Sequence, residues 1–342
     1  MLLSSSTSGD NIDEESLERL SIHYPFNRLS RDARELYLET TSISRISVPT
    51  PLEFYRDYVS KNKPVIITNA LNDWPALSKW SNSYLREQLH DTRVTIDITP
   101  DGLGDAVKKH KYFVTPLEEK MKFNDFMDII EGKDDRKEIV YCQHQNSSFM
   151  TEFEKLHGDI SELKWVKEAF GQQSPDAVNI WIGTAKSVSS LHHDPYENLY
   201  GVIQGRKYFT LYPPTDLYWL NQQMFKKAHY ERLTTEQRII DDNGMDLRDG
   251  SQFVIVPDTD QSLVPWFDHE LDIDTDYLNP LNVVVEKGEL LYLPSLWFHR
   301  VSQITTTIAV NFWYDMQYDL KWNYYQFMNE IIKQRRQNSP LE

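Results

Sequence analysis

The hydrophobic residues of this chain follow two different spacings, and the change between them falls near residue 138. Before that point, apolar positions at helical intervals predict helices around Arg31–Glu39, Ser83–Leu89 and Phe123–Ile130. The last of these helices is expected to end near Gly132, because glycine commonly follows a helix C-terminus.

A helix start and a buried strand are also visible in this first part of the chain. Thr50, Pro51 and Glu53 have the spacing of a capping box with proline at the first helical position. The run Pro64–Thr68 (PVIIT) predicts a buried strand. Residues 1–15 are rich in serine and acidic residues and predict a disordered tail. We therefore expect 16–137 to form a helical and mixed region that packs on a β-rich body.

From residue 138 onward the chain is dominated by short runs of branched and aromatic residues bounded by Gly, Pro or Asn. This pattern of short apolar runs predicts a mainly β domain over 138–330, which would be an antiparallel barrel or jelly roll with surrounding helices. The acidic stretch Asp241–Asp276 is interpreted as an insertion between strands, with a loop that faces the substrate. The expected strands lie in IVYCQHQ, AVNIWIG, SVSSLHHD, NLYGVIQG, KYFTLYPP, NVVVEKGELLYLP and WFHRVSQITTTIAVNFWYD.

The chain closes with a predicted helix that reaches about residue 336. Its apolar stripe packs on the barrel or pairs with a second subunit, and burial within one chain is the expectation. A homodimer is the alternative. The stripe consists of Leu320, Tyr324, Phe327, Met328 and Ile331.

Composition narrows the class of protein. Hydrophobic residues make up 40% of the 342 residues, enough for a substantial core, which excludes a disordered or fibrous chain. With 36 basic and 52 acidic residues the net charge is −16, which disfavours binding to nucleic acid or anionic membranes and favours basic partners. The alternative interpretation is that the negative charge only keeps the protein soluble.

The single cysteine, Cys142, excludes an internal disulfide framework and a multi-cysteine zinc site. It fits a reducing compartment. The first residues contain too short an apolar run for a signal peptide, and charged residues and proline interrupt the apolar stretch Gly288–Val301. We expect a cytoplasmic protein, with the nucleus as a second location.

A candidate metal site begins in SLHHDPYENLY. On a strand, residues i and i+2 share a face, so His192 and Asp194 can reach one ion while His193 points away. Such triplets are common and most bind nothing. A second element, LYLPSLWFHRVSQ, places His299 among apolar neighbours, where a buried imidazole needs a partner. That partner is either a backbone carbonyl or a shared metal ion.

Two histidines and one carboxylate are the facial triad of Fe(II) oxygenases, which leaves three sites on the ion for an oxo acid and dioxygen. Zinc accepts the same ligands with a water in a hydrolytic site. The triad alone leaves both metals open.

Lys207 distinguishes an Fe(II) oxygenase site from a hydrolytic zinc site. In KYFTLYPP it shares one strand face with Phe209 and Leu211, so a lysine stands on an apolar side. A buried ammonium needs a counter-charge, and the distal carboxylate of 2-oxoglutarate supplies one. The alternative is a lysine at the strand end that reaches water.

Four further polar residues are candidates for the same pocket. Tyr141 is a phenol donor for the carboxylate. Ser189 lies three residues before His192, on the opposite strand face unless a bulge intervenes. Asn198 and Asn311 could form hydrogen bonds near the metal or the oxo acid. Each of these residues is also compatible with an ordinary polar group of the core.

Together these segments resemble the Jumonji-C family of 2-oxoglutarate oxygenases. The resemblance rests on SLHHDPYENLY, GRKYFTLYPP, GELLYLPSLWFHRV and IAVNFWYDMQYDLK, and it covers nearly the whole chain after about residue 15. The N-terminal TPLEFYRDYVSKNKPVIITNALNDWPAL is similar to the family's branch of small protein-lysyl hydroxylases.

The resemblance implies a double-stranded β-helix, which is a cupin-like jelly roll, that uses Fe(II), 2-oxoglutarate and O2. It implies hydroxylation of a lysine carbon in a GTP-binding protein of the developmentally regulated class. The matching positions are His192, Asp194 and His299 for the metal and Lys207, Tyr141 and Ser189 for the co-substrate, with Asn198 beside it and Asn311 matching by motif.

Other functions remain compatible with the same residues. A lysine demethylase shares this chemistry and differs in its substrate. A metal-dependent endopeptidase would cleave its substrate without 2-oxoglutarate. A scaffold that binds basic partners would need no metal. Hydroxylation is the principal hypothesis, because the chain contains a complete set of metal ligands and no zinc-finger cysteines.

Overall fold

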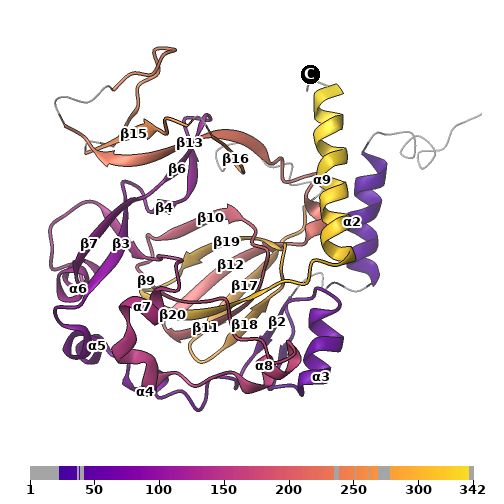
Figure 1. Cartoon of the computed structure of the whole chain (residues 1–342), viewed down its shortest axis with the longest axis horizontal. Helices are drawn as coiled ribbons and strands as arrows, with labels where there is room; N and C mark the ends of the chain where they lie inside the picture. Colours follow the sequence, from indigo (N-terminus) through magenta and orange to yellow (C-terminus); the bar gives the residue numbers. More distant parts are fainter. Residues whose placement is uncertain are drawn as a thin grey trace, which may run out of the picture.

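The computed structural model describes residues 23–36, 38, 42–234, 239–250, 252–260, 262–268 and 278–338. The predicted tail at residues 1–15 lies outside these ranges. Two curved sheets face each other and form the body of the molecule, a third sheet lies beyond one end, and helices cover the outside (Figure 1). The predicted mainly β fold with surrounding helices is confirmed.

The larger sheet has nine strands and is antiparallel except at one edge, where β1 and β2 run parallel. Four of its strands come from the segment before residue 138, so this segment contributes directly to the sheet. In spatial order the strands are β1 (Arg45–Ile46), β2 (Val65–Ile67), β18 (Leu290–Leu293), β11 (Tyr196–Gln204), β20 (Thr307–Asp315), β9 (Ala177–Gly183), β8 (Ile139–Cys142), β3 (Arg93–Thr99) and β7 (Leu117–Lys122).

The smaller sheet packs against the inner face of the larger one. Its strand β12, between β17 and β19, alternates buried residues with more exposed ones, as a strand with one face on a core must. The strands in order are β17 (Leu281–Glu286), β12 (Arg206–Tyr212), β19 (Phe298–Gln303), β10 (Val188–His192) and β4 (Leu103–Gly104).

A third sheet includes part of the predicted acidic insertion. We expected a loop over Asp241–Asp276, but its described residues include three strands that join or extend a sheet. The expectation of a plain loop is therefore wrong for these residues. The strands are β14 (Arg248–Asp249), β15 (Phe253–Pro257), β13 (Gln223–Arg232), β6 (Tyr112–Thr115) and β5 (Ala106–Lys108), with β16 (Leu263–Trp266) paired to β13.

Apolar residues form separate layers on the two faces of the nine-stranded sheet. One layer fills the space between the two facing sheets, and it includes Trp181, Tyr200, Phe209 and Val301. A larger layer lies under the helices on the outer face of the same sheet. Because both faces are covered, a strand such as β11 is buried almost continuously.

Two of the predicted helices, Ser83–Leu89 and Phe123–Ile130, begin and end close to the observed bounds, whereas the helix predicted over Arg31–Glu39 spans Tyr24–Leu36. The capping box at Thr50 and Glu53 is confirmed, with both reciprocal hydrogen bonds in place. The helices are α2 (Tyr24–Leu36), α3 (Pro51–Phe54, continued by a π-helical turn over Tyr55–Val59), α4 (Ala76–Lys79), α5 (Asn82–Leu89), α6 (Phe123–Ile130), α7 (Ser148–Glu152), α8 (Lys164–Ala169) and α9 (Leu320–Asn338).

The apolar stripe of α9 differs from the prediction. Leu320, Tyr324 and Phe327 are 80%, 44% and 60% exposed, whereas Tyr325 and Ile332 are buried. Apolar side chains occur on more than one face of this helix, so periodicity alone did not identify the face that packs. The expectation that the named stripe is buried within one chain is wrong for these three residues.

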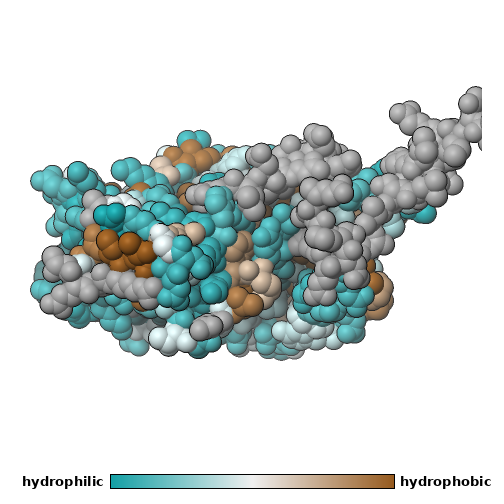
Figure 2. All heavy atoms as spheres, turned by 90° about the horizontal axis from the view of Figure 1, so that it is seen from above, coloured by the Kyte–Doolittle hydropathy of each residue, from teal (hydrophilic) through white to brown (hydrophobic). Residues whose placement is uncertain are grey.

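Elsewhere the surface seen from above is mostly hydrophilic, with apolar side chains in separate patches (Figure 2). No helix in the described part of the chain has the length and apolar character needed to cross a membrane.

We predict that Phe54→Ala lowers the free energy of unfolding by about 3–5 kcal/mol, since a fully buried ring is lost. The Phe54 ring contacts Trp165 and Tyr292 edge-on at centroid distances of 5.0 and 4.9 Å. Urea denaturation followed by fluorescence measures the effect. Leu52→Ala on the same helix is the control, because Leu52 is 69% exposed and should change stability by about 0.5 kcal/mol or less. Equal effects of the two substitutions would contradict this packing.

Candidate metal centre and co-substrate pocket

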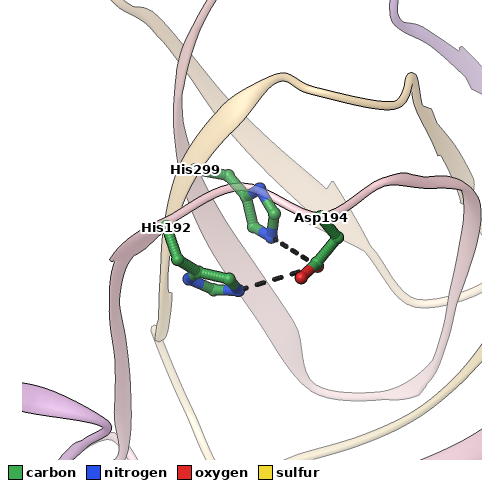
Figure 3. A group of neighbouring side chains, drawn as sticks. All are labelled: His192, Asp194 and His299. Carbon is green, nitrogen blue, oxygen red and sulfur yellow. Dashed lines mark ion pairs between the residues drawn. The ribbon is translucent and has the colours of Figure 1, made fainter. Parts of the chain in front are cut away.

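The three predicted metal ligands converge at one end of the smaller sheet. Antiparallel pairing of β10 with β19 places His192 directly opposite His299, and their ring centroids are 4.2 Å apart. Asp194 follows two residues after His192, and its carboxylate points toward both imidazoles (Figure 3). Residues more than a hundred positions apart in the sequence thus meet because two strands pair in this register.

Backbone carbonyls determine which ring nitrogen of each histidine faces the centre. Nδ1 of His192 lies 2.7 Å from the Ser190 carbonyl, and Nδ1 of His299 lies 2.9 Å from the Trp297 carbonyl. A carbonyl oxygen only accepts, so Nδ1 carries the proton in both rings and donates it. The lone pair is left on Nε2, which is the atom turned toward Asp194. Burial lowers the pKa of His299 well below its usual value, which favours the neutral form that a metal requires.

The spacing of the ligand atoms fits a shared ion. Nε2 of His192 and of His299 lie 3.8 and 3.6 Å from Asp194 Oδ2, too far for a hydrogen bond. Two ligand bonds of about 2.1 Å can span such distances. The three ligand atoms all lie within 4.8 Å of one another. The donor set of two imidazoles and one carboxylate therefore fits Fe(II) and leaves one side of the ion open.

His193 points away from this centre, as strand geometry predicts. Its ring contacts Phe298 edge-on, and Tyr325 Oη lies 2.8 Å from its Nε2. Burial lowers its pKa to about 4. His193 therefore connects the strand to α9, outside the candidate metal site.

Lys207 is fully buried in the space between the two facing sheets. Its Nζ donates to the Tyr141 hydroxyl at 2.9 Å and lies 4.9–5.4 Å from three aromatic ring centroids, those of Tyr141, Trp181 and Tyr200. No carboxylate among the described residues forms an ion pair with it. Burial lowers the pKa of Lys207 well below its usual value. A dicarboxylate that enters this pocket would supply the missing counter-charge, so the residues fit 2-oxoglutarate.

Ser189 reaches the same pocket because the strand is irregular. The register of β10 against β19 shifts between Ser189 and His192, which is the bulge that the sequence left open. The bulge brings Ser189 into the lining of the pocket with Tyr141 and Lys207. Gly183 lies opposite Tyr141 on β9, and a Cβ there would come within 2.7 Å of the phenol ring. Glycine at this position leaves room for the ring.

Asn198 and Asn311 occupy different places. Asn198 lines the pocket, whereas Asn311 is fully buried one strand away on β20. Asn311 donates to Asn198 Oδ1 at 3.1 Å and accepts from Trp181 Nε1 at 2.8 Å. Asn311 therefore orients two groups of the pocket wall.

Sequence reasoning missed three aromatic residues of the site. Trp181 and Tyr200 line the lysine pocket, and Trp266 of β16 stacks on His192 with centroids 5.9 Å apart and planes 5° apart. In strands that are buried on both faces, alternation does not distinguish the inner face, and Trp266 belongs to a segment predicted as loop.

Comparison with known proteins agrees with this geometry. A model of the cupin-like domain family matches residues 51–320. The chain is 40% identical over 91% of its length, and 94% of the relative's, to "JmjC domain-containing protein E" of Dictyostelium discoideum. It is 40% identical to the human "Bifunctional peptidase and (3S)-lysyl hydroxylase JMJD7", with 88% and 92% of the two chains covered. It is 37% identical to "Lysine-specific demethylase JMJ32" of Arabidopsis thaliana, with 92% and 93% covered.

We predict that Lys207→Met abolishes stabilisation by 2-oxoglutarate while metal binding persists, because the substitution removes the only cation found in the described lining of this pocket. With Mn(II) in place of iron and air excluded, 2-oxoglutarate at 100 times its Kd stabilises the wild type by about 2.7 kcal/mol. Thermal unfolding with and without 2-oxoglutarate measures this difference. Arg206→Met, at the exposed neighbouring position, is the matched control and should retain it. Retention of the full ligand effect in Lys207→Met would exclude this pocket as the co-substrate site.

We predict that Lys207→Met also stabilises the ligand-free protein, and more so at pH 7 than at pH 10. The pKa of Lys207 is lower in the folded chain than its unfolded value of about 10.4, so below that value the unfolded state binds more protons. The wild type therefore gains stability as pH rises toward 10.4, and the advantage of the variant shrinks. Urea midpoints at the two pH values test this, and an advantage that grows with pH would contradict it.

Proposed function

This chain belongs to the Jumonji-C family of cupin-like, 2-oxoglutarate-dependent oxygenases, and on that premise we propose that it hydroxylates lysine side chains of protein substrates. One observation supports an oxygenase above all. The candidate metal ligands and the unpaired Lys207 line the same pocket. A hydrolytic metal site has no need of a buried cation at this position.

Members of this family generally use Fe(II), 2-oxoglutarate and O2. In this chain His192, Asp194 and His299 would hold the iron, and Lys207, Tyr141 and Ser189 would hold the distal carboxylate of 2-oxoglutarate. Bound together, these groups supply the oxidation in which one atom of O2 enters the C–H bond of the substrate and the other enters succinate, with release of CO2.

The protein's own residues prepare the centre for that chemistry. The carbonyls of Ser190 and Trp297 hold both imidazoles in the tautomer that binds metal. Tyr141 accepts a hydrogen bond from Lys207, and Asn311 aligns Trp181 and Asn198 around the pocket. Burial raises the pKa of Cys142 well above its usual value, which makes this thiol a poor nucleophile for a peptidase reaction.

The choice of lysyl hydroxylation over demethylation rests on the resemblance to small protein-lysyl hydroxylases and on the activity named for the human relative. The Arabidopsis relative is named as a demethylase. We extend the proposal to a GTP-binding protein of the developmentally regulated class as substrate. We also extend it to the cytoplasm as location, with the nucleus as a second one. The exposed apolar residues of α9 support a homodimer as part of the same proposal.

We predict that the iron-loaded protein adds one oxygen atom to a lysine of such a GTP-binding protein, with one succinate formed for each oxygen added. Mass spectrometry of the substrate and quantification of succinate measure the two products. His192→Ala should reduce both products to the level of the metal-free protein, because the ligand set is incomplete. Loss of a methyl group from lysine, or peptide-bond cleavage without 2-oxoglutarate, would identify the demethylase or the peptidase instead.

A further inference from the structure

A second cavity of about 760 Å³ opens beside the metal centre. Gln145 lines both this cavity and the inner pocket that holds the triad and Lys207, so the two spaces adjoin. Its wall includes four carboxylates from different elements: Asp97 of β3, Asp105 between β4 and β5, Glu118 of β7 and Glu231 of β13. A cluster of acidic residues alone does not make a binding site. Whether these residues can bind a ligand depends on the contacts that each carboxylate makes.

Asp97 is buried with an unsatisfied oxygen. It faces the same side of the sheet as Tyr141, its direct partner across β3 and β8, and is only 8% exposed. Oδ2 accepts from Gln143 Nε2 at 2.8 Å, whereas Oδ1 has no hydrogen-bond partner. Burial raises its pKa to about 7, and the nearby charges of Asp105 and Glu118 act in the same direction. A buried carboxylate oxygen without a donor is costly, so an absent donor is expected here.

Asp105 is held next to the metal centre by its backbone. β4 runs parallel to β10, the strand that carries His192. Ser190, two residues before His192, donates a hydrogen bond from its Oγ to the Asp105 carbonyl at 2.5 Å. Asp105 has φ of 51°, in the left-handed region that costs energy for most residues other than glycine. Burial raises the pKa of its carboxyl to about 6, and the neighbouring His192 acts in the opposite direction.

Gln143 lies between these two acidic residues. Its Nε2 donates a hydrogen bond to Asp97. The same nitrogen lies so close to Gly104 that a Cβ added to this glycine would come within 2.5 Å of it. Gly104 therefore allows the amide to pack against the backbone that carries Asp105. The arrangement holds two like charges close together with no lysine or arginine paired to either one in the described part of the chain.

The chemistry of the missing partner follows from this geometry. A positive group that donates hydrogen bonds satisfies both carboxylates. Among the described residues, the metal centre is the only group of three or more histidine, cysteine or carboxylate side chains whose ligand atoms all lie within 4.8 Å of one another. Asp97 and Asp105 therefore lack the third protein ligand that a metal site usually has. A primary ammonium on a flexible chain meets these requirements, with three N–H donors.

We propose that Asp97 and Asp105 form the subsite that receives the ε-ammonium of the substrate lysine and selects lysine over uncharged side chains. The proposal rests on the proposed function, because it assumes that a lysine carbon lies at the metal. It assigns Asp97 and Asp105 a role in substrate specificity, whereas the oxidation itself depends on the metal ligands His192, Asp194 and His299.

The test compares two acetylated nonapeptides with Gly and Ser flanks that differ only at the central residue, which is lysine or norleucine. Norleucine keeps the four-carbon chain and lacks the ammonium. Binding to full-length protein loaded with Mn(II) and 2-oxoglutarate, with air excluded, is measured from the relaxation that Mn(II) induces in peptide protons. This readout detects millimolar binding and reports proximity to the metal without turnover.

The wild type should bind the lysine peptide at least about tenfold more tightly than the norleucine peptide. Asp97→Asn keeps an oxygen for Gln143 and should reduce this preference to about twofold or less, as should Asp105→Asn. Glu118→Gln is the matched control, since it removes the same charge from the same cavity at a side chain that is 60% exposed. It should leave most of the preference intact.

Folding is tested separately. At pH 8, above the raised pKa of Asp97, Asp97→Asn should melt no lower than the wild type and should retain full stabilisation by 2-oxoglutarate. A lysine preference that survives in both aspartate variants, or falls equally in Glu118→Gln, overturns the subsite.

The outcomes also separate this proposal from the function it rests on. A lysine preference that depends on Asp97 without any oxygen added to lysine supports the subsite and refutes the hydroxylase. Lysine hydroxylation with unchanged preference in both variants refutes the subsite alone.

Discussion

The burial of one ammonium group between two sheets is the constraint on which the site depends. Lys207 lies in a space lined by aromatic rings, and within the described part of the chain its ammonium donates a hydrogen bond to a phenol oxygen and forms no ion pair. Such a group destabilises the ligand-free chain and becomes favourable when a carboxylate enters. The two sheets therefore have to stay packed when no ligand is bound, and the apolar residues buried on the outer face of the nine-stranded sheet stabilise that packing.

The same principle operates at the candidate metal centre and at the acidic cavity. His192 and His299 each use one nitrogen on a backbone carbonyl, so the other nitrogen is available to an ion. Asp97 uses one oxygen on Gln143, so the other lacks a donor. In each of these side chains, one polar atom forms a hydrogen bond within the protein and the other is left available to a ligand. The three unsatisfied positions lie around one connected space.

Much of this site was predictable because local geometry determines it. Strand alternation alone separated His192 and Asp194 from His193 and placed Lys207 on an apolar face. Other residues depended on irregularities that the sequence does not announce. Ser189 reaches the pocket through a bulge. Asp97 belongs to β3, a strand that we did not predict, although Val94, Ile96 and Ile98 alternate with polar residues there.

The sequence by itself determined the residue types and their faces: the ligand triplet on one strand, the later histidine, the lysine among apolar neighbours, and the capping box at Thr50. Periodicity supplies that information because side-chain direction repeats every two residues in a strand. Only the tertiary structure decided which strands pair, and so that His192 meets His299 and that Asp105 lies beside them. Pairing register depends on contacts between residues far apart in the chain, which no local pattern encodes.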